Sequence, residues 1–274
     1  MTDTAPLYSP ATVRALLERH RLRADKAFGQ NFLIDGNVLR NIVAAAEVQD
    51  TDTVFEVGPG LGVLTRELAE QAGRVVSVEL DARLLPVLRE TTADYPNVAL
   101  SEGDALDYDL TSLPPQSLFV ANLPYNVATP LVVRALESLR FRRLVFLVQK
   151  EVAERLSASP ATPSYGALSL VVQHFARVRV VQHVGPNAFF PAPDITSSVV
   201  RLDVNPDAEP DPATFRLIRD AFRHRRKTLK KNLTMAGYDA TRVTEVLEGL
   251  ELDPKIRAEA LGLEHFRRLG RALA

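Results

Sequence analysis

The sequence contains no cysteine and no tryptophan, and only two methionines and five histidines among its 274 residues. Without cysteine the chain can form no disulfide and no thiolate zinc site, and the scattered histidines show no HExxH-like spacing. Runs of 18 apolar residues are also lacking, and the first ten residues, MTDTAPLYSP, have neither a basic nor an apolar signal region. These absences predict a cytoplasmic protein with no metal site and no membrane partner.

The charged residues are distributed unevenly along the chain. The formal net charge is only −1, yet residues 50–112 hold 13 Asp and Glu against 4 Lys and Arg, a balance of −9. Residues 213–231 hold 8 Lys and Arg against one Asp, a balance of +7. The acidic region suits a cationic cofactor, and the basic region suits the phosphates of a nucleic acid.

Short apolar runs rich in β-branched residues alternate with helical patterns through the first 150 residues. This alternation predicts an α/β fold with a mostly parallel, doubly wound sheet. The predicted strands are 53–57, 74–80, 98–101, 117–121 and 143–149, followed by an antiparallel pair, 176–184 and 197–204, at the sheet edge. Hydrophobic residues make up 46% of the chain, which is enough to bury a core.

Capping residues and prolines mark the helices outside this sheet. Ser9-Pro10 predicts the start of a helix that runs through His20, and Asp35 predicts the start of a second helix. The proline-rich segment NPDAEPDP at 205–212 predicts a stiff polar linker. We therefore expect a first domain over 1–205, with an N-terminal helical extension, and a small all-α domain over 206–274.

Candidate ligand-binding residues follow successive predicted strands, where a doubly wound sheet binds its ligand. EVGPGLG at 56–62 contains the glycines of a tight turn, although a glycine turn alone can be a simple connection. Glu79 can accept hydrogen bonds from ribose hydroxyls, and Asp104 from an adenine amino group. The alternatives are a solvated Glu79 and an Asp104 that forms only an Asx turn. The GxGxG spacing after Glu56 fits S-adenosylmethionine enzymes better than nicotinamide enzymes, so we expect a Rossmann-like methyltransferase sheet.

The segment Asn122-Leu123-Pro124-Tyr125 directly follows the apolar run SLFVA. The exocyclic amine of a base is a poor nucleophile because its lone pair is delocalised into the ring. An amide oxygen and a backbone carbonyl can accept its two N–H hydrogens, and an aromatic ring can lie under the base. These four residues supply all three parts, and together with the glycine turn they predict methyl transfer to such an amine. A structural Asn122 that caps the strand end is the alternative.

Several further motifs accompany these segments: FGQNFLID at 28–35, GDAL at 103–106, NLPYN at 122–126, QKEVAERL at 149–156, YGALS at 165–169 and FFPAP at 189–193. In this combination the chain closely resembles the KsgA-type ribosomal RNA adenine dimethyltransferases, over about residues 26–233. The resemblance implies S-adenosylmethionine-dependent N6,N6-dimethylation of two adjacent adenosines near the 3′ end of small-subunit (16S) ribosomal RNA.

The resemblance also implies roles for individual residues. The expected cofactor-binding residues are Asn31, Leu33, Glu56, Gly58, Gly60, Glu79, Asp104, Ala105 and Asn122. The expected catalytic residues, which face the target base, are Asn122, Leu123, Pro124, Tyr125 and Phe189. Phe190 is the second candidate for the opposite face of the base, and a role in the hydrophobic core is the alternative for Phe189.

The basic region is predicted to bind RNA phosphates. On a continuous helix its cationic residues lie opposite an apolar stripe formed by Phe215, Ile218, Phe222, Leu229 and Leu233. The expected RNA-binding residues are Arg219, Arg223, Arg226, Lys227 and Lys230, and the alternative is ordinary solvated charge. Basic positions that could extend the track are Arg21, Arg23, Lys26, Arg140, Arg142 and Arg143.

Three other functions compete with this interpretation. One is dimethylation of an adenine in large-subunit ribosomal RNA, and a second is a ribosome-assembly or RNA-binding factor with secondary activity. The third, a DNA adenine methyltransferase, is disfavoured because its motif usually begins with Asp rather than Asn. We expect a monomer whose partner is small-subunit ribosomal RNA or the pre-assembled small ribosomal subunit.

Overall fold

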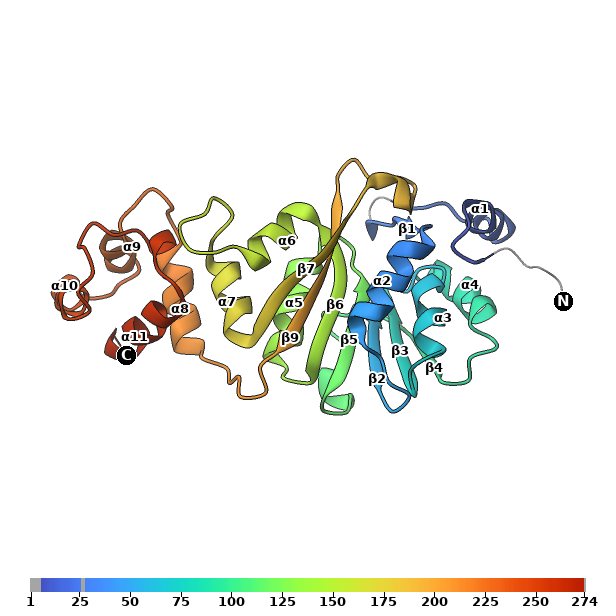
Figure 1. Cartoon of the computed structure of the whole chain (residues 1–274), viewed down its shortest axis with the longest axis horizontal. Coiled ribbons are helices and arrows are strands. Elements are labelled where there is room, and N and C mark those ends of the chain that lie inside the picture. The colour runs from blue at the N-terminus through green and yellow to red at the C-terminus, as the bar shows by residue number, and fades with distance from the viewer. Residues whose placement is uncertain (1–5, 26–27, 274) are drawn as a thin grey trace. The chain divides into compact units, whose positions relative to one another are not determined.

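The computed structural model describes residues 6–25 and 28–273 of the chain. It divides into two compact units (Figure 1). Of the described residues, the first unit contains those up to Ala153 together with Arg177–Pro206, and the second contains Glu154–Ala176 and those from Asp207 onward. Each unit has its own buried core.

A seven-stranded sheet forms the centre of the first unit, in the order β4-β3-β2-β5-β6-β9-β7. The strands are β2 (Thr53–Val57), β3 (Arg74–Glu79), β4 (Val98–Glu102), β5 (Ser117–Asn122), β6 (Phe141–Gln149), β7 (Ala176–Val184) and β9 (Ser197–Val204). The pairs from β4 to β6 are parallel, and β9 runs antiparallel to β6. This mostly parallel sheet confirms the predicted fold class.

The first unit also contains helices, two of which begin at the predicted capping residues Ser9 and Asp35. The helices are α1 (Pro10–Arg19), α2 (Gly36–Ala46), α3 (Val63–Ala69), α4 (Leu85–Thr91), α5 (Ala128–Glu137) and the start of α6 (Lys150–Ser157). Ser9 Oγ accepts a hydrogen bond from the Thr12 amide at the start of α1, as predicted. Asp35 accepts from two amides at the start of α2, which confirms the second predicted helix start.

The sheet separates two apolar layers. Successive side chains of a strand point to opposite faces, so Val54 packs with α2 and α3 whereas Phe55 lies on the other face. There the Phe55 ring lies 5.9 Å from Phe119 and 5.0 Å from Tyr108. Both strands β2 and β5 are buried along nearly their whole length. This buried centre gives the residues that follow β2, β3 and β5 a rigid support.

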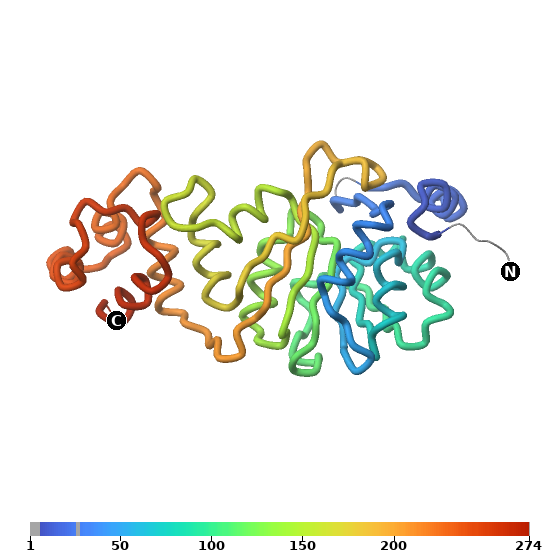
Figure 2. The backbone as a smooth tube through the Cα atoms, viewed as in Figure 1, coloured from blue at the N-terminus to red at the C-terminus, as the bar shows by residue number. Residues whose placement is uncertain are grey.

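Two short strands lie outside the main sheet. They are β1 (Phe32–Leu33) and β8 (Phe189–Phe190), which pair antiparallel although they are far apart in the sequence (Figure 2). The register places Phe32 opposite Phe190 and Leu33 opposite Phe189. Single turns of 3₁₀ helix occur at Ala82–Leu84, Leu110–Ser112, Pro186–Ala188 and Ala258–Ala260.

The second unit is helical. Its elements are the end of α6, then α7 (Ala167–Phe175), α8 (Pro212–Ala221), α9 (Leu229–Met235), α10 (Ala240–Gly249) and α11 (Leu263–Leu273). It differs from the expected 206–274 domain because residues 154–176 belong to it. Tyr165 and Leu170 are buried in the same cluster as Leu217, and the Tyr165 hydroxyl donates to the Leu261 carbonyl at 2.8 Å.

The expectation of one continuous helix through the basic region is wrong. Helix α8 ends at Ala221, and α9 begins at Leu229. The buried side chain of Asn232 donates to the carbonyls of Ala221 and His224 at 2.8 and 3.1 Å, and Thr228 caps the start of α9. These bonds pair the Ala221 carbonyl at the end of α8, a loop carbonyl and the Lys231 amide in the first turn of α9, which stabilises the break.

Candidate active site

A cavity of about 220 Å³ lies at the carboxyl ends of β2, β3 and β5 in the first unit. Ligands of doubly wound sheets bind at this edge. The cavity is lined by these predicted site residues: Asn31, Leu33, Glu56, Gly58, Gly60, Glu79, Asp104, Ala105, Asn122, Leu123, Pro124 and Tyr125. The structure therefore brings together residues that are up to 94 positions apart in the sequence.

The glycine turn after β2 forms one wall of the cavity. Gly58 and Gly60 have φ angles of +65° and +61°, in the left-handed region that glycine tolerates best. A Cβ atom on Gly60 would lie 3.2 Å from the Phe32 ring, and one on Gly58 would lie 3.6 Å from Pro124. The turn therefore brings backbone close to the cavity, which is what a bound nucleotide cofactor requires.

Two buried carboxylates face this region. Burial raises the pKa of Glu56 to about 7, although the Ser77 hydroxyl donates a hydrogen bond to it at 2.7 Å. Burial also raises the pKa of Glu79, whose oxygens accept from the amides of Gly60 and Asp81. Within the described residues neither carboxylate has a cationic partner, so this end of the sheet favours a positively charged ligand.

Asp104 is an exposed residue at the cavity and forms the Asx turn that was its structural alternative. One oxygen, Oδ1, accepts from the Leu106 amide at 2.8 Å. The turn fixes the direction of the carboxylate next to the buried Ala105. The Asx turn and a ligand-binding role are compatible, because a carboxylate can accept several hydrogen bonds.

The amide of Asn122 is oriented by the N-terminal segment. Its Nδ2 donates to the main-chain carbonyl of Asn31 at 3.1 Å. This bond uses the donor side of the amide and leaves Oδ1 as an acceptor at the cavity. Tyr125 lies half-buried in the same wall, and its hydroxyl exchanges a hydrogen bond with Ser197 at 2.6 Å. Burial raises the pKa of the Tyr125 hydroxyl, so the phenol is neutral.

Several further residues of the site were not predicted individually. Phe28 and Gln30 line the cavity, and both belong to the FGQNFLID segment that had been singled out as a motif. Gln30 donates to Asp81 at 2.8 Å, and the Arg83 guanidinium lies 5.5 Å from the centre of the Phe28 ring. These contacts tie the N-terminal segment to the chain that follows Glu79.

The predicted contact between Phe189 and the base is not supported. Within the part of the chain that the structure describes, neither Phe189 nor Phe190 lines the cavity. Phe189 is 2% exposed and packs in the core with Val184 and Val199. Phe190 points to the other side of β8, where Arg14 lies 5.2 Å from the ring centre. The pairing of β8 with β1 fixes the directions in which the Phe189 and Phe190 side chains point. Phe189 therefore has the role in the hydrophobic core that was its alternative.

The basic residues of the second unit lie on two helices and the loop between them. Arg219 is exposed on α8, Arg223 and Arg226 are exposed in the loop, and Lys227 and Lys230 are half-buried. The Lys227 ammonium also lies 3.1 Å from the Met235 sulfur. The charge is concentrated as predicted, but a loop rather than one helix face presents part of it.

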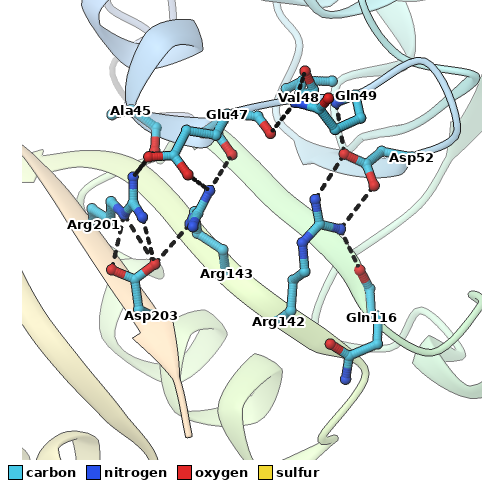
Figure 3. Close-up of polar contacts among 11 residues, drawn as sticks. Ala45, Glu47, Val48, Gln49, Asp52, Gln116, Arg142, Arg143, Arg201 and Asp203 are labelled. Carbon is cyan, nitrogen blue, oxygen red and sulfur yellow. Dashed lines mark hydrogen bonds and ion pairs between the residues drawn. The ribbon is translucent and has the colours of Figure 1, made fainter. Parts of the chain in front are cut away.

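Two arginines proposed to extend the basic track have structural partners instead. Figure 3 shows Arg142 bonded to both oxygens of Asp52, at 2.8 Å each. Arg143 donates to Asp203 and to the Ala46 carbonyl at the end of α2. Their guanidinium groups therefore serve the fold. Lys26 lies outside the described residues.

Comparison with known proteins assigns the chain to a family. Residues 21–266 match the profile described as "Ribosomal RNA adenine dimethylase". The chain belongs to the ribosomal RNA adenine dimethylase family. It is therefore a ribosomal RNA adenine methyltransferase, and enzymes of this kind use S-adenosylmethionine.

Individual relatives agree with this assignment. The chain is 48% identical over 272 residues to "Ribosomal RNA small subunit methyltransferase A" of Deinococcus radiodurans, covering 99% of this chain and 93% of that protein. The protein of the same name from Moorella thermoacetica is 41% identical, with 97% and 98% covered. A dimethyladenosine transferase structure from Plasmodium falciparum aligns with a TM-score of 0.77 at 27% identity, over 87% and 95% of the two chains. The 23S rRNA methyltransferase ErmE aligns with a TM-score of 0.69, also at 27% identity, over 89% and 99%.

The residues at the cavity fit S-adenosylmethionine. The donor is cationic, and Glu56 and Glu79 are buried carboxylates without a cationic partner among the described residues. Gly58 and Gly60 hold the turn in the left-handed region, and a Cβ on them would contact Pro124 and Phe32 of the cavity wall. Two further observations concern membrane spans and metal sites. No described helix is long and apolar enough to cross a membrane, and residues 6–25 and 28–273 hold no cluster of three His, Asp or Glu that could bind a metal ion.

Proposed function

We propose that the protein dimethylates N6 of two adjacent adenosines near the 3′ end of small-subunit ribosomal RNA. The observation that carries the proposal is the oriented Asn122 amide beside Tyr125, in a cavity whose other wall fits S-adenosylmethionine. Proteins named small-subunit methyltransferases are 48% and 40% identical to this chain over nearly its whole length. This similarity supports small-subunit rather than large-subunit ribosomal RNA as the substrate. We further propose that the enzyme is a cytoplasmic monomer.

In this proposal the first unit binds the cofactor. Glu79 accepts hydrogen bonds from the ribose hydroxyls, and Asp104 accepts from the adenine amino group through the oxygen that its Asx turn leaves free. Gly58 and Gly60 allow backbone to approach the methionine portion, and Asn31 and Leu33 cover it. The remaining contacts come from Glu56 and Ala105. When bound, S-adenosylmethionine supplies a methyl group on a cationic sulfur that is a strongly activated leaving group.

The target adenine is held at the Asn-Leu-Pro-Tyr corner. Asn122 Oδ1 accepts one N6 hydrogen, and a backbone carbonyl accepts the second. The Val127 amide uses one of the two lone pairs of the Pro124 carbonyl, at 3.2 Å, so we propose the Leu123 carbonyl as the second acceptor. Tyr125 lies against the face of the flipped-out base. These contacts hold the nitrogen lone pair in the direction of transfer.

Positioning and desolvation supply most of the rate in this arrangement. Favourable orientation is worth up to about 7–11 kcal/mol in well-aligned reactions. No strong general base is required, because the amine becomes acidic once it carries an additional methyl group and a positive charge. A neutral Asn122 also suits a second round of transfer, since one N–H remains to be bound after the first.

The second unit would grip the RNA backbone. Arg219, Arg223 and Arg226 are exposed and concentrate positive charge that can replace the counterions of phosphates. Lys227 and Lys230 flank them. We therefore propose the first unit as the methyltransferase domain and the helices after the linker as the part that contacts the ribosomal RNA or subunit.

The proposal is tested by incubating the protein and S-adenosylmethionine with unmethylated small ribosomal subunits. The RNA is then digested, and mass spectrometry is used to detect and map N6,N6-dimethyladenosine. We expect two adjacent dimethylated positions near the 3′ end. Large subunits treated in parallel provide the control, and product on those subunits alone would replace the proposal with the large-subunit alternative.

A further inference from the structure

We propose that Ser197 is a positioning residue for methyl transfer, and that its hydroxyl holds the ring of Tyr125 against the target adenine. The inference rests on the proposed function, because it assumes that an adenine lies against Tyr125. Ser197 itself does not line the cavity among the described residues, so it acts through Tyr125 alone.

The contact between the two hydroxyl groups is short and partly buried. Tyr125 Oη lies 2.6 Å from Ser197 Oγ. Ser197 is completely buried, whereas Tyr125 is half-buried and lines the cavity. The tyrosine thus has one part at the ligand site and its polar end inside the protein. A buried hydroxyl that loses its partner is destabilised, so the buried Ser197 hydroxyl favours the paired position.

Ser197 and the Tyr125 segment are attached to the same central strand. Ser197 begins β9 and pairs with Gln149 at the end of β6. On the other side of β6, Asn122 pairs with Leu147, and the Leu123 amide donates to the Leu147 carbonyl at 3.2 Å. Strand β6 is therefore a common rigid reference for the backbone before Tyr125 and for the hydroxyl at the end of its ring.

The ring needs this second attachment because its backbone lies in a turn. The Pro124 carbonyl accepts from the Val127 amide, which closes a tight turn around Tyr125. The turn fixes the main chain but leaves rotation of the side chain to packing and to the hydroxyl. Misplacing a reacting group by about 1 Å can cost about 100-fold in rate. Among the described residues, the Ser197 hydroxyl is the polar group that restrains the Tyr125 ring.

The chain contains a matched control at the next position. Ser198 is also completely buried and lies on the same strand, but it points to the other face of the sheet. Its hydroxyl lies 2.9 Å from His183 Nδ1 instead of Tyr125. Ser197→Ala and Ser198→Ala therefore remove the same atom from equally buried sites, and only the first breaks the link to the cavity.

The kinetic test uses unmethylated small subunits with Ser197→Ala, Ser198→Ala, Tyr125→Phe and the Ser197→Ala/Tyr125→Phe double variant. We expect Ser197→Ala to lower kcat about 10-fold, with KM for the subunit unchanged within about twofold. Tyr125→Phe should lose a similar factor, the double variant no more, and Ser198→Ala should keep the wild-type kcat. A wild-type kcat in Ser197→Ala, an equal loss in Ser198→Ala, or losses that multiply in the double variant would overturn the proposal.

A second measurement needs no methyl transfer. The six tyrosines of the chain can be labelled with 3-fluorotyrosine, and the fluorine resonance that Tyr125→Phe removes belongs to Tyr125. We expect this resonance to shift or broaden in Ser197→Ala and to stay unchanged in Ser198→Ala. An unchanged resonance in Ser197→Ala contradicts the positioning role. If the wild type produces no dimethyladenosine, the proposed function fails, and the fluorine spectrum still decides the Ser197 contact.

Discussion

Acidic side chains have opposite environments at the two ends of the central sheet. At the carboxyl end of the parallel strands, Glu56 and Glu79 are buried with raised pKa values and have no cationic partner among the described residues. At the other end, Glu47, Asp52 and Asp203 form ion pairs with Arg142, Arg143 and Arg201 (Figure 3). Hydrogen bonds from Arg201 hold the pKa of Glu47 below its usual value.

The difference separates structural from functional charge. Arg201 and Arg143 donate to the carbonyls of Ala45 and Ala46 and thereby cap the carboxyl end of α2. They complete the hydrogen bonds of the fold itself. Burial opposes ionisation of the two carboxyl groups at the cavity, and a positively charged or hydrogen-bond-donating ligand would relieve that cost. Strongly perturbed carboxylates in a cleft are typical of functional sites.

The largest expected effect is at the amide that faces the base. Asn122→Ala should lower the turnover number with unmethylated small subunits by about 100-fold, because the amine loses its orienting acceptor. Thermal unfolding should change little, since among the described residues the Asn122 side chain makes one hydrogen bond, to the carbonyl of the half-buried Asn31. Wild-type turnover in this variant would remove Asn122 from the mechanism.

The next effect compares one carboxylate from each end of the sheet. Glu79→Gln should weaken S-adenosylmethionine binding about 10-fold in calorimetry, because an amide NH₂ cannot accept from ribose hydroxyls or from the Gly60 amide. Asp52→Asn removes the two-point partner of Arg142 and should lower the free energy of unfolding by about 1–2 kcal/mol. It should leave the affinity unchanged. Equal losses of affinity in both variants would contradict the distinction between the two ends.

A third prediction concerns pH. The pKa of Glu56 rises from 4.5 to about 7 on folding, so the protonated form stabilises the fold below pH 4.5 and this stabilisation is lost as pH rises through 7. Glu56→Gln should not lose stability in this way, because glutamine does not ionise. Between pH 5 and 8 the variant should gain about 2 kcal/mol of unfolding free energy relative to the wild type. Denaturant titrations at the two pH values measure the change, and a constant difference would show that Glu56 does not titrate in this range.

The smallest effect is expected in the basic loop of the second unit. Arg226→Ala should weaken binding to small subunits about threefold at physiological salt and reduce the salt dependence of binding by about one counterion. Arg142→Ala is the comparison, because its guanidinium is already paired with Asp52. An unchanged salt dependence in Arg226→Ala would indicate that this charge in the basic loop is solvated and does not contact RNA phosphates.

Much of the fold was predictable because its signals are local. The strand runs are short, β-branched and nearly fully buried, and the caps at Ser9 and Asp35 need only their own next residues. The cavity residues were predictable for a topological reason: parallel strands that are neighbours bring their carboxyl ends to one edge. Twelve predicted residues line the cavity as a result.

The failures share a tertiary cause. Phe189 and Phe190 are adjacent residues of the same type, so the local sequence does not distinguish them. The pairing of β8 with β1 decides that Phe189 enters the core. The break between α8 and α9 depends on Asn232, whose side chain caps a helix eleven residues earlier. The helical periodicity of the apolar residues continues through the break, so the sequence pattern could not reveal it.

A structure of the enzyme with S-adenosylmethionine bound tests the central claim most directly. The account predicts that the transferable methyl carbon faces the corner formed by Asn122 and Tyr125, with space for an adenine whose N6 can approach to about 3–3.5 Å. It also predicts that Glu79 contacts the ribose of the donor. A methyl carbon that points away from this corner, with no room for a ring beside it, would contradict the account.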